Sequence, residues 1–203
     1  MKLQVKVGNI IEQDVDAIVV NLFEDVSKPD GATKSVNTAM KDTITNLIET
    51  GEIKGRAGEL TLIHTQNSIK PRRVLVAGLG PKEKFNQDSI RSISGAVVRF
   101  LNAKKIKTYS TVLHGSGIGG IETSIAARSI AEGTILGAYK FSEHKSKKQK
   151  QYIEQVTVVE MDNSKVSDIK RGLDEGVSIA SSVSLARDMV NQPANYMTPS
   201  DLV

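Results

Sequence analysis

The sequence predicts an α/β protein in which helices cover a β-sheet. Segments that are continuously apolar, or apolar at every second position, alternate along the chain with segments whose apolar residues recur every three or four positions. Residues 17–20 and 74–77 are apolar without alternation, which is typical of central strands covered on both faces. We therefore expect a sheet with helices on its two faces.

Six segments carry the strand pattern. The first alternates charged and apolar side chains, and the others are apolar either at every second position or continuously. The expected strands are residues 2–7, 16–22, 59–65, 73–79, 108–114 and 152–161.

Three helices are expected between these strands. In the first, Thr33 or Ser35 is a possible N-cap and Gly51 ends the helix. The second spans residues 88–103 and the third residues 122–141. The apolar faces of the three helices consist, in order, of Val36, Met40, Ile44, Leu47 and Ile48; of Ile90, Ile93, Val97, Phe100 and Leu101; and of Ile130, Thr134, Ala138 and Phe141.

A fourth helix is expected over residues 164–191, longer than the usual ~11 residues. Pro193 ends it. We interpret it as a connector between a domain of residues 1–162 and a further domain that begins in residues 193–203, with the connector at residues 163–192. The alternative is a fourth covering helix of the same domain. Its apolar stripe consists of Val166, Ile169, Leu173, Val177, Ala180 and Val190.

Composition restricts the function classes. The 203 residues include no cysteine, which excludes disulfides, thiolate metal ligands and a cysteine nucleophile. The first residues lack the apolar run of a signal peptide, and no stretch approaches the ~18 apolar residues of a membrane span. We therefore expect a cytoplasmic protein without a membrane partner. The formal net charge of +4 comes from a mixed charge pattern and does not indicate a polycation.

A glycine-rich segment follows the expected fifth strand. Gly115, Gly117 and Gly120 match G-x-G-x-x-G before a helix, where bare backbone N–H groups attract an anion. A dinucleotide site also needs an acidic residue about 20 residues further on, and Glu160 and Asp162 lie about twice as far away. The segment is thus a candidate anion loop or a tight turn.

Other polar residues do not combine into an active site. His64 alternates with apolar residues and is interpreted as a half-buried, hydrogen-bonded side chain. His144 lies next to Glu143, without the H-E-x-x-H pattern of a zinc peptidase. Gly78 and Gly80 are interpreted as glycines that let the chain turn after a buried strand. No catalytic, cofactor-binding or metal-ligating residue is assigned from the residues alone.

Four segments resemble the leucine (cytosol) aminopeptidase family. Residues 186–199 read A-R-D-M-V-N-Q-P-A-N-Y-M-T-P, which closely resembles the start of that family's catalytic domain. Three weaker matches lie upstream in the family's order: G-R-A-G-E at residues 55–59, V-L-V-A-G-L-G-P at residues 74–81, and A-E-G-T-I-L-G-A-Y-K-F-S-E-H-K-S-K-K at residues 131–148.

The resemblance implies a macro-domain-like mixed sheet flanked by helices, followed by a long connector helix. It also implies a parent enzyme, a hydrolase that releases amino-terminal residues, especially leucine, from peptides. The separate catalytic domain of that enzyme holds two divalent ions, zinc or manganese. The ligand motif of that domain, N-T-D-A-E-G-R, does not occur in these 203 residues. The resemblance thus implies a non-catalytic domain without a cofactor of its own, which serves assembly of a hexamer and access to the active site.

Two alternatives remain from the sequence. Macro-like folds elsewhere bind nucleotides or ADP-ribose, and the glycine loop lies where phosphates would bind. Some bacterial members of the family also bind DNA, and only the run Lys145, Lys147, Lys148 and Lys150 favours that here. A charge run of this kind is usually a solvated loop, which is the preferred interpretation. The aromatic content of 4% provides few stacking platforms for single-stranded nucleic acid.

Overall fold

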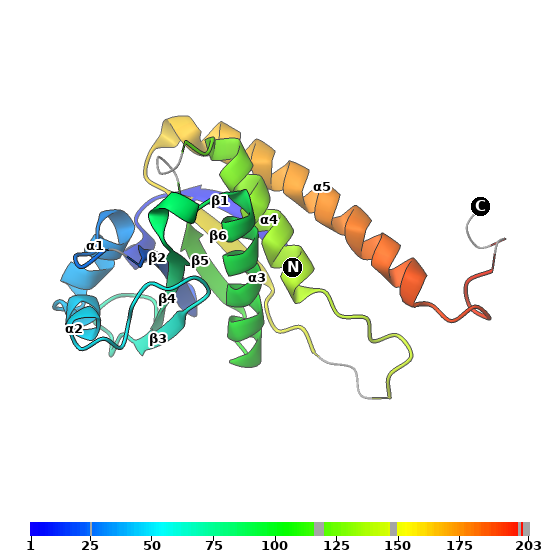
Figure 1. The fold of residues 1–203 in the computed structure, drawn as a ribbon, viewed down its shortest axis with the longest axis horizontal. Helices are drawn as coiled ribbons and strands as arrows, with labels where there is room; N and C mark the ends of the chain where they lie inside the picture. The colour runs from blue at the N-terminus through cyan, green and yellow to red at the C-terminus, as the bar shows by residue number, and fades with distance from the viewer. Residues whose placement is uncertain (25, 116–119, 147–149, 199, 201–203) are drawn as a thin grey trace.

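A computed structural model of the chain describes residues 1–24, 26–115, 120–146, 150–198 and 200. Six strands form one sheet in the order β1-β6-β5-β2-β4-β3 (Figure 1). All neighbours are parallel except β3 and β4, which are antiparallel. The predicted α/β fold with a mixed sheet is confirmed. The strands are β1 (Lys2–Val7), β2 (Ala17–Phe23), β3 (Leu60–His64), β4 (Arg73–Gly80), β5 (Thr108–Val112) and β6 (Gln155–Glu160).

The continuous apolar runs lie in the centre of the sheet, as expected. β2 and β4 are hydrogen-bonded neighbours, with Ile18 opposite Val74 and Val20 opposite Val76. Side chains that alternate along these strands enter two separate core clusters, one on each face. Both faces of the central strands are therefore covered.

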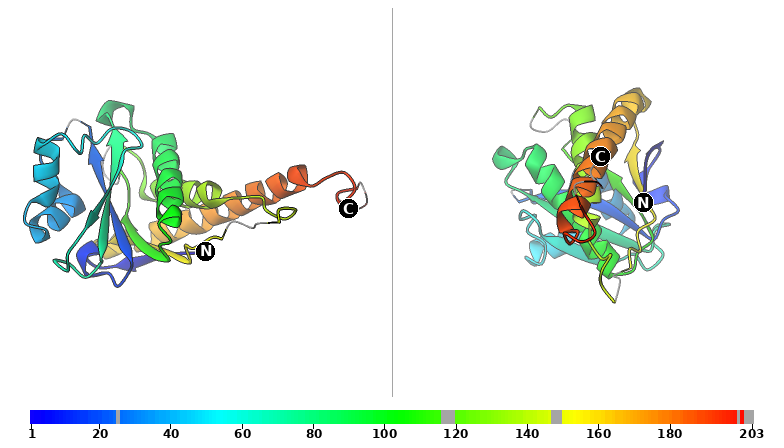
Figure 2. Two further views of the ribbon diagram at one scale, coloured as in Figure 1. Left: turned by 90° about the horizontal axis from the view of Figure 1, so that it is seen from below. Right: turned by 90° about the vertical axis from the view of Figure 1, so that its right-hand side faces the viewer.

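In the described part of the chain, five α-helices cover the two faces (Figure 2, left). The helices α1 and α2 lie on one face, and α3, α4 and α5 on the other. The bounds are α1 (Gly31–Ala39), α2 (Thr43–Glu49), α3 (Gln87–Ala103), α4 (Thr123–Ala138) and α5 (Val166–Asn191). Short 3₁₀ turns occur at η1 (Ile10–Glu12), η2 (Lys82–Lys84) and η3 (Asn163–Lys165).

The prediction of a single first helix is wrong, because two helices, α1 and α2, lie in that segment. Lys41 and Asp42 adopt the left-handed conformation, with φ of 52° and 59°, and this breaks the helix between α1 and α2. The N-cap of α1 is Asp30, whose side chain accepts a hydrogen bond from Gly31 N. Thr33 and Ser35, the predicted caps, lie inside α1. The predicted apolar face nevertheless packs into one core cluster.

The other helices differ from expectation mainly at their ends. α3 begins at Gln87 and buries the predicted residues except Phe100, which is half-buried. α4 ends at Ala138, so Phe141 lies beyond the helix. The expected half-buried, hydrogen-bonded placement of His64 is wrong. The residue is exposed, and its side chain has no hydrogen-bond partner among the described residues.

Helix α4 lies between α3 and α5 at very short range. A Cβ added to Gly172 of α5 would lie 2.1 Å from Ser124 O, and one added to Gly133 of α4 would lie 2.3 Å from Arg91 O. Contacts this short require glycine because any side chain would overlap the neighbouring backbone. Glu132 of α4 also forms ion pairs with Arg91 and Arg128. The three helices thus form one tightly packed layer.

Helix α5 covers the domain with its first half and extends past it with its second half (Figure 1). Ile169, Leu173 and Ala180 are buried. Leu185 and Val190 are 61% and 86% exposed. The expected stripe therefore packs on the domain only as far as Ala180. The domain boundary near residue 163 remains a prediction.

Candidate functional site

The carboxyl edge of the parallel strands is one place where a ligand could bind. His114 follows β5 at this edge and is 2% exposed. Its Nδ1 accepts a hydrogen bond from Asn21 Nδ2 at 3.1 Å, and its Nε2 lies 3.3 Å from Thr111 Oγ1. Burial lowers the pKa of His114 to about 4. The imidazole is therefore neutral at neutral pH and joins β2 to β5.

The predicted glycine loop lies only partly within the described residues, because Gly117 is outside them. Gly115 has a φ of 75°, and a Cβ there would lie 2.2 Å from a ring carbon of Phe85. The Phe85 ring also packs edge-on against Phe23 with a centroid distance of 5.2 Å. Gly115 thus lets the chain pass over Phe85, and anion binding by Gly115, Gly117 and Gly120 remains a prediction.

Two of the family-like segments contact each other at the carboxyl end of β4. Gly78 N donates to Glu59 O at 2.8 Å, and Gly80 N donates to Gly55 O at 2.8 Å. A Cβ at Gly78 would lie 2.1 Å from Arg56 O. The expectation that Gly78 and Gly80 only let the chain turn is wrong, because both lie in β4 and allow residues 55–59 to approach it. The G-R-A-G-E and V-L-V-A-G-L-G-P segments therefore form one structural unit.

The loop that contains G-R-A-G-E is held by its last residue. The Glu59 carboxylate accepts hydrogen bonds from Lys54 N at 2.9 Å and Arg56 N at 3.2 Å. A Cβ at Gly55 would lie 2.4 Å from Phe23 O. These contacts explain the motif by backbone geometry and packing.

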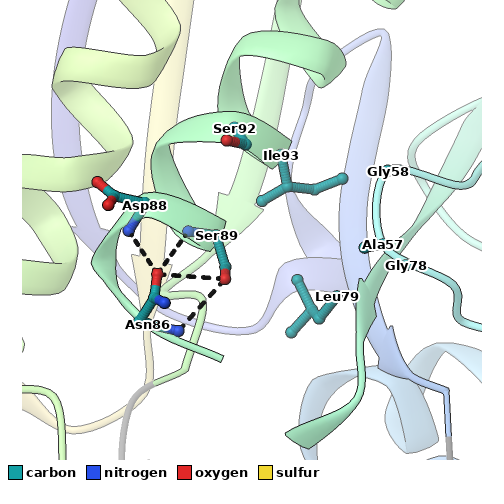
Figure 3. A pocket seen from close by; sticks show the side chains of 9 residues that line it. All are labelled: Ala57, Gly58, Gly78, Leu79, Asn86, Asp88, Ser89, Ser92 and Ile93. Carbon is teal, nitrogen blue, oxygen red and sulfur yellow. Dashed lines mark hydrogen bonds between the residues drawn. The ribbon is translucent and has the colours of Figure 1, made fainter. Parts of the chain in front are cut away.

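A cavity of about 400 Å³ lies between this loop and the start of α3 (Figure 3). Asn86 caps α3, and its Oδ1 accepts hydrogen bonds from Asp88 N and Ser89 N at 2.9 and 3.1 Å. Two of the helix N–H groups that would attract an anion are thus already paired, and Asp88 adds a negative charge to the same turn. The cavity is lined by Ala57, Gly58, Gly78, Leu79, Asn86, Asp88, Ser89, Ser92 and Ile93.

The other two family-like segments meet at the end of α5. Tyr139 Oη donates to Asp188 Oδ1 at 2.8 Å. His144 Nε2 lies 2.7 Å from Gln192 Oε1, and Gln192 Nε2 donates to the Glu143 carboxylate. We call these five residues the junction cluster. It joins the segment after α4 to the point where the chain leaves α5.

Aromatic contacts extend the junction cluster. The Arg187 guanidinium lies 5.5 Å from the centroid of the Tyr139 ring. The ring centroids of His144 and Tyr196 are 4.8 Å apart. Sequence reasoning did not place His144 and Gln192 together, although both lie in family-like segments. The arrangement can orient the chain beyond α5, and its polar groups bind one another rather than converging on an open space.

Removing the Gln192 side chain is expected to loosen this junction. The amide bridges Glu143 and His144, so Gln192→Ala removes both hydrogen bonds. We expect backbone amides of residues 189–198 to exchange about fivefold faster, which corresponds to about 1 kcal/mol of lost hydrogen bonding. Hydrogen exchange read by mass spectrometry measures this. Gln151→Ala, at an exposed residue away from the cluster, is the control. Equal exchange in the two variants would contradict the bridging role.

The described residues contain neither a candidate metal centre nor a candidate membrane span. There, no three or more His, Asp or Glu side chains are grouped so that they could hold a metal ion. The described helices include none that is both long enough and apolar enough to cross a bilayer.

Comparisons with known proteins identify the family. Residues 19–148 match the "Cytosol aminopeptidase family, N-terminal domain". A probable cytosol aminopeptidase from Alkaliphilus oremlandii is 29% identical over 202 residues, which cover 98% of this chain and 40% of that protein. The chain thus spans about two fifths of the length of such relatives.

Solved structures with the same fold include a leucine aminopeptidase, a bottromycin maturation enzyme and macrodomains. A tomato leucine aminopeptidase mutant has a TM-score of 0.81 at 18% identity, covering 100% of this chain and 40% of that chain. The bottromycin maturation enzyme BotP in complex with Mn has a TM-score of 0.67 at 24% identity, covering 93% and 34%. A macrodomain mutant from Oceanobacillus iheyensis with ADPR has a TM-score of 0.67 at 15% identity, covering 87% and 94%.

The family match covers most of the described sheet and its helices, and the four motif segments lie together in two pairs. The chain therefore belongs to the cytosol aminopeptidase family, in which it corresponds to the N-terminal domain.

Proposed function

We propose that this chain is the non-catalytic N-terminal domain of a leucyl aminopeptidase that releases amino-terminal residues from peptides. The junction cluster is the observation that carries the proposal. It fixes the direction of the chain at the end of α5, where Leu185 and Val190 expose apolar side chains. Burial of these two side chains against a second domain would be favourable. A following catalytic domain would cover this end of the helix.

The chemistry of the proposed enzyme belongs to that following domain. A pair of divalent ions, zinc or manganese, would polarise the peptide carbonyl and supply hydroxide there. The described residues of this chain do not fit such a pair, because their carboxylates and histidines are not grouped. This domain would instead support assembly of a cytoplasmic homohexamer and limit access of peptides to the active sites.

The proposal predicts that the 203-residue chain alone does not hydrolyse an L-leucine anilide, with or without added zinc or manganese. The reason is the absence of a ligand cluster in the described residues. Release of the aniline, followed by absorbance, measures the activity. Metal-dependent turnover that co-purifies with the chain, and persists after contaminants are removed, would contradict the non-catalytic assignment.

Reading the coding sequence beyond Val203 tests the parent activity separately. We expect the motif N-T-D-A-E-G-R downstream in the same reading frame. An unrelated downstream sequence would leave the family membership intact and refute the proposed aminopeptidase parent.

Binding of ADP-ribose is the second candidate function, and the fold shared with a macrodomain that carries ADPR supports it. Phe85 lies directly against Gly115, where the loop would need to admit a phosphate. We therefore expect calorimetric titration with ADP-ribose or NAD to give no dissociation constant below about 1 mM. Micromolar binding that is lost in Gly117→Val would favour the binding module instead.

Nucleic-acid binding has less support. Lys147 and Lys148 lie outside the described residues, and Lys150 lies over the Tyr152 ring at 5.4 Å. No feature of the described residues adds to the lysine run as a reason for DNA binding.

A further inference from the structure

The outer strand β3 has a free edge. It pairs with β4 on one side, and no described strand pairs with its other side. None of its five residues is buried, whereas seven of the eight residues of β4 are. Leu60, Leu62 and Ile63 are therefore aliphatic side chains that stay half-buried at the margin of the sheet.

The hydrogen-bond register shows which backbone groups of β3 are free. Gly78 N donates to Glu59 O at 2.8 Å, and Thr65 N donates to Arg72 O at 3.1 Å. In an antiparallel ladder such bonded pairs occur at every second residue. Thr61 and Ile63 thus direct their backbone groups toward β4. Leu60, Leu62 and His64 direct their N–H and C=O groups away from it.

The two outer strands of the sheet differ in charge. Lys2 and Lys6 lie on β1, and lysine on an edge strand opposes pairing with another chain. β3 carries no charged residue. If two copies of β1 paired about Gln4, Lys2 of each would face Lys6 of the other, which is repulsive.

Two copies of β3 can pair without such repulsion. An antiparallel pair centred on Leu62 places Leu60 of each copy opposite His64 of the other, and Thr61 opposite Ile63. The free backbone groups of Leu60, Leu62 and His64 then satisfy one another across the two-fold axis. Charge and register therefore both permit this arrangement at β3.

The surface beside β3 has room for the second strand's side chains. A cavity of about 640 Å³ runs along β3 toward α2. Its lining includes apolar Met40, Leu47 and Ile63 and also charged Lys41 and Glu52, which have opposite signs. Ile63 lies on the sheet face that α1 and α2 cover. A two-fold axis perpendicular to the sheet leaves equivalent side chains of the two copies on the same face of the joined sheet. Ile63 of the second copy therefore lies beside Thr61 on the cavity side.

From these observations we propose that β3 pairs antiparallel with β3 of a second copy of this chain, joining the two sheets into one. The interface consists of backbone hydrogen bonds along residues 60–64 and of side-chain contacts over the cavity beside α2, where Ile63 meets Thr61 of the other copy. It is separate from the exposed end of α5.

Sedimentation velocity over a range of concentrations tests the pairing. We expect a reversible monomer–dimer equilibrium in the unaltered chain. Leu62→Lys places two ammonium groups opposite one another and is expected to weaken the dimer about tenfold or more. His64→Pro removes an N–H that faces the second copy without removing a bond to β4, and should also weaken it. His64→Ala keeps that N–H and should leave the dimer intact.

Hydrogen exchange identifies the surface involved. We expect the amides of Leu62 and His64 to exchange more slowly as the concentration rises, while Ile63, bonded to β4, is protected throughout. A chain that stays monomeric at the highest concentration would overturn the proposal. A dimer that forms equally in His64→Pro and His64→Ala would also overturn it. So would concentration-dependent protection at Leu185 and Val190 alone, because that places the contact on α5.

Discussion

Replacing Gly172 with alanine is expected to lower the free energy of unfolding by about 2 to 3 kcal/mol. In an open helix the same change stabilises by about 1 kcal/mol, because alanine has the higher helix propensity. Here the added Cβ would lie 2.1 Å from Ser124 O, which is the backbone of α4 and cannot rotate away. Separation of α4 and α5 would then expose Ile169 and Leu173, which are now buried. Urea unfolding followed by circular dichroism measures the loss.

Ser181→Ala provides the matched control on the same helix. Ser181 is exposed, so its replacement changes helix propensity without a steric cost and should be neutral or slightly stabilising. If Gly172→Ala were as stable as Ser181→Ala, α5 would not be held against α4 by backbone-to-backbone packing.

Acid is expected to destabilise the protein through His114. Its pKa is about 4 in the folded chain and 6.5 in its ordinary state. Between these values the unfolded chain binds a proton that the folded chain does not, so stability rises with pH in this window. The contribution of neutral His114 to the free energy of unfolding is complete above about pH 6.5 and is lost as the pH falls toward 4. The full shift corresponds to roughly 3 kcal/mol.

A comparison with His114→Gln isolates this effect from other titrating groups. Glutamine does not titrate and can still form a hydrogen bond with Asn21 or Thr111. We expect the wild-type chain to lose stability relative to the variant as the pH falls from 6.5 to 4, and the difference to be constant above pH 7. A difference that does not change with pH would show that the imidazole is protonated without cost in the folded state.

The sequence predicted the sheet well because its central strands depend on burial alone. Residues 17–20 and 74–77 have one stable placement, between two covered faces, and they lie there as neighbours. The break after α1 was not predictable from periodicity, because Val36, Met40 and Ile44 keep a helical spacing across it. The break depends on the left-handed conformations of Lys41 and Asp42, which carry no distinctive side-chain pattern.

In the candidate sites, too, the sequence predicted which segments matter but not how they contact one another. The resemblance identified the segments that form the junction cluster, but not that His144 would contact Gln192, since that pairing depends on how far α5 extends past α4. The sequence shows glycine at positions 78 and 80 but not what approaches them. Only the approach of residues 55–59 from elsewhere in the chain shows why a side chain is excluded there.

The length of α5 makes it a lever. Its 26 residues are fixed against α4 as far as Ala180, and the last 11 extend by about 16 Å at a rise of about 1.5 Å per residue. A tilt of about 5° at the glycine contacts would displace the end of the helix by more than about 1 Å. Displacements of that size separate productive from unproductive alignment of catalytic groups. A Cβ at Gly176 of α5 would lie 2.6 Å from Arg128 O of α4, so Gly172 and Gly176 both allow the close approach to α4. The fit of these two glycines would thus set the position of anything attached at the far end of α5.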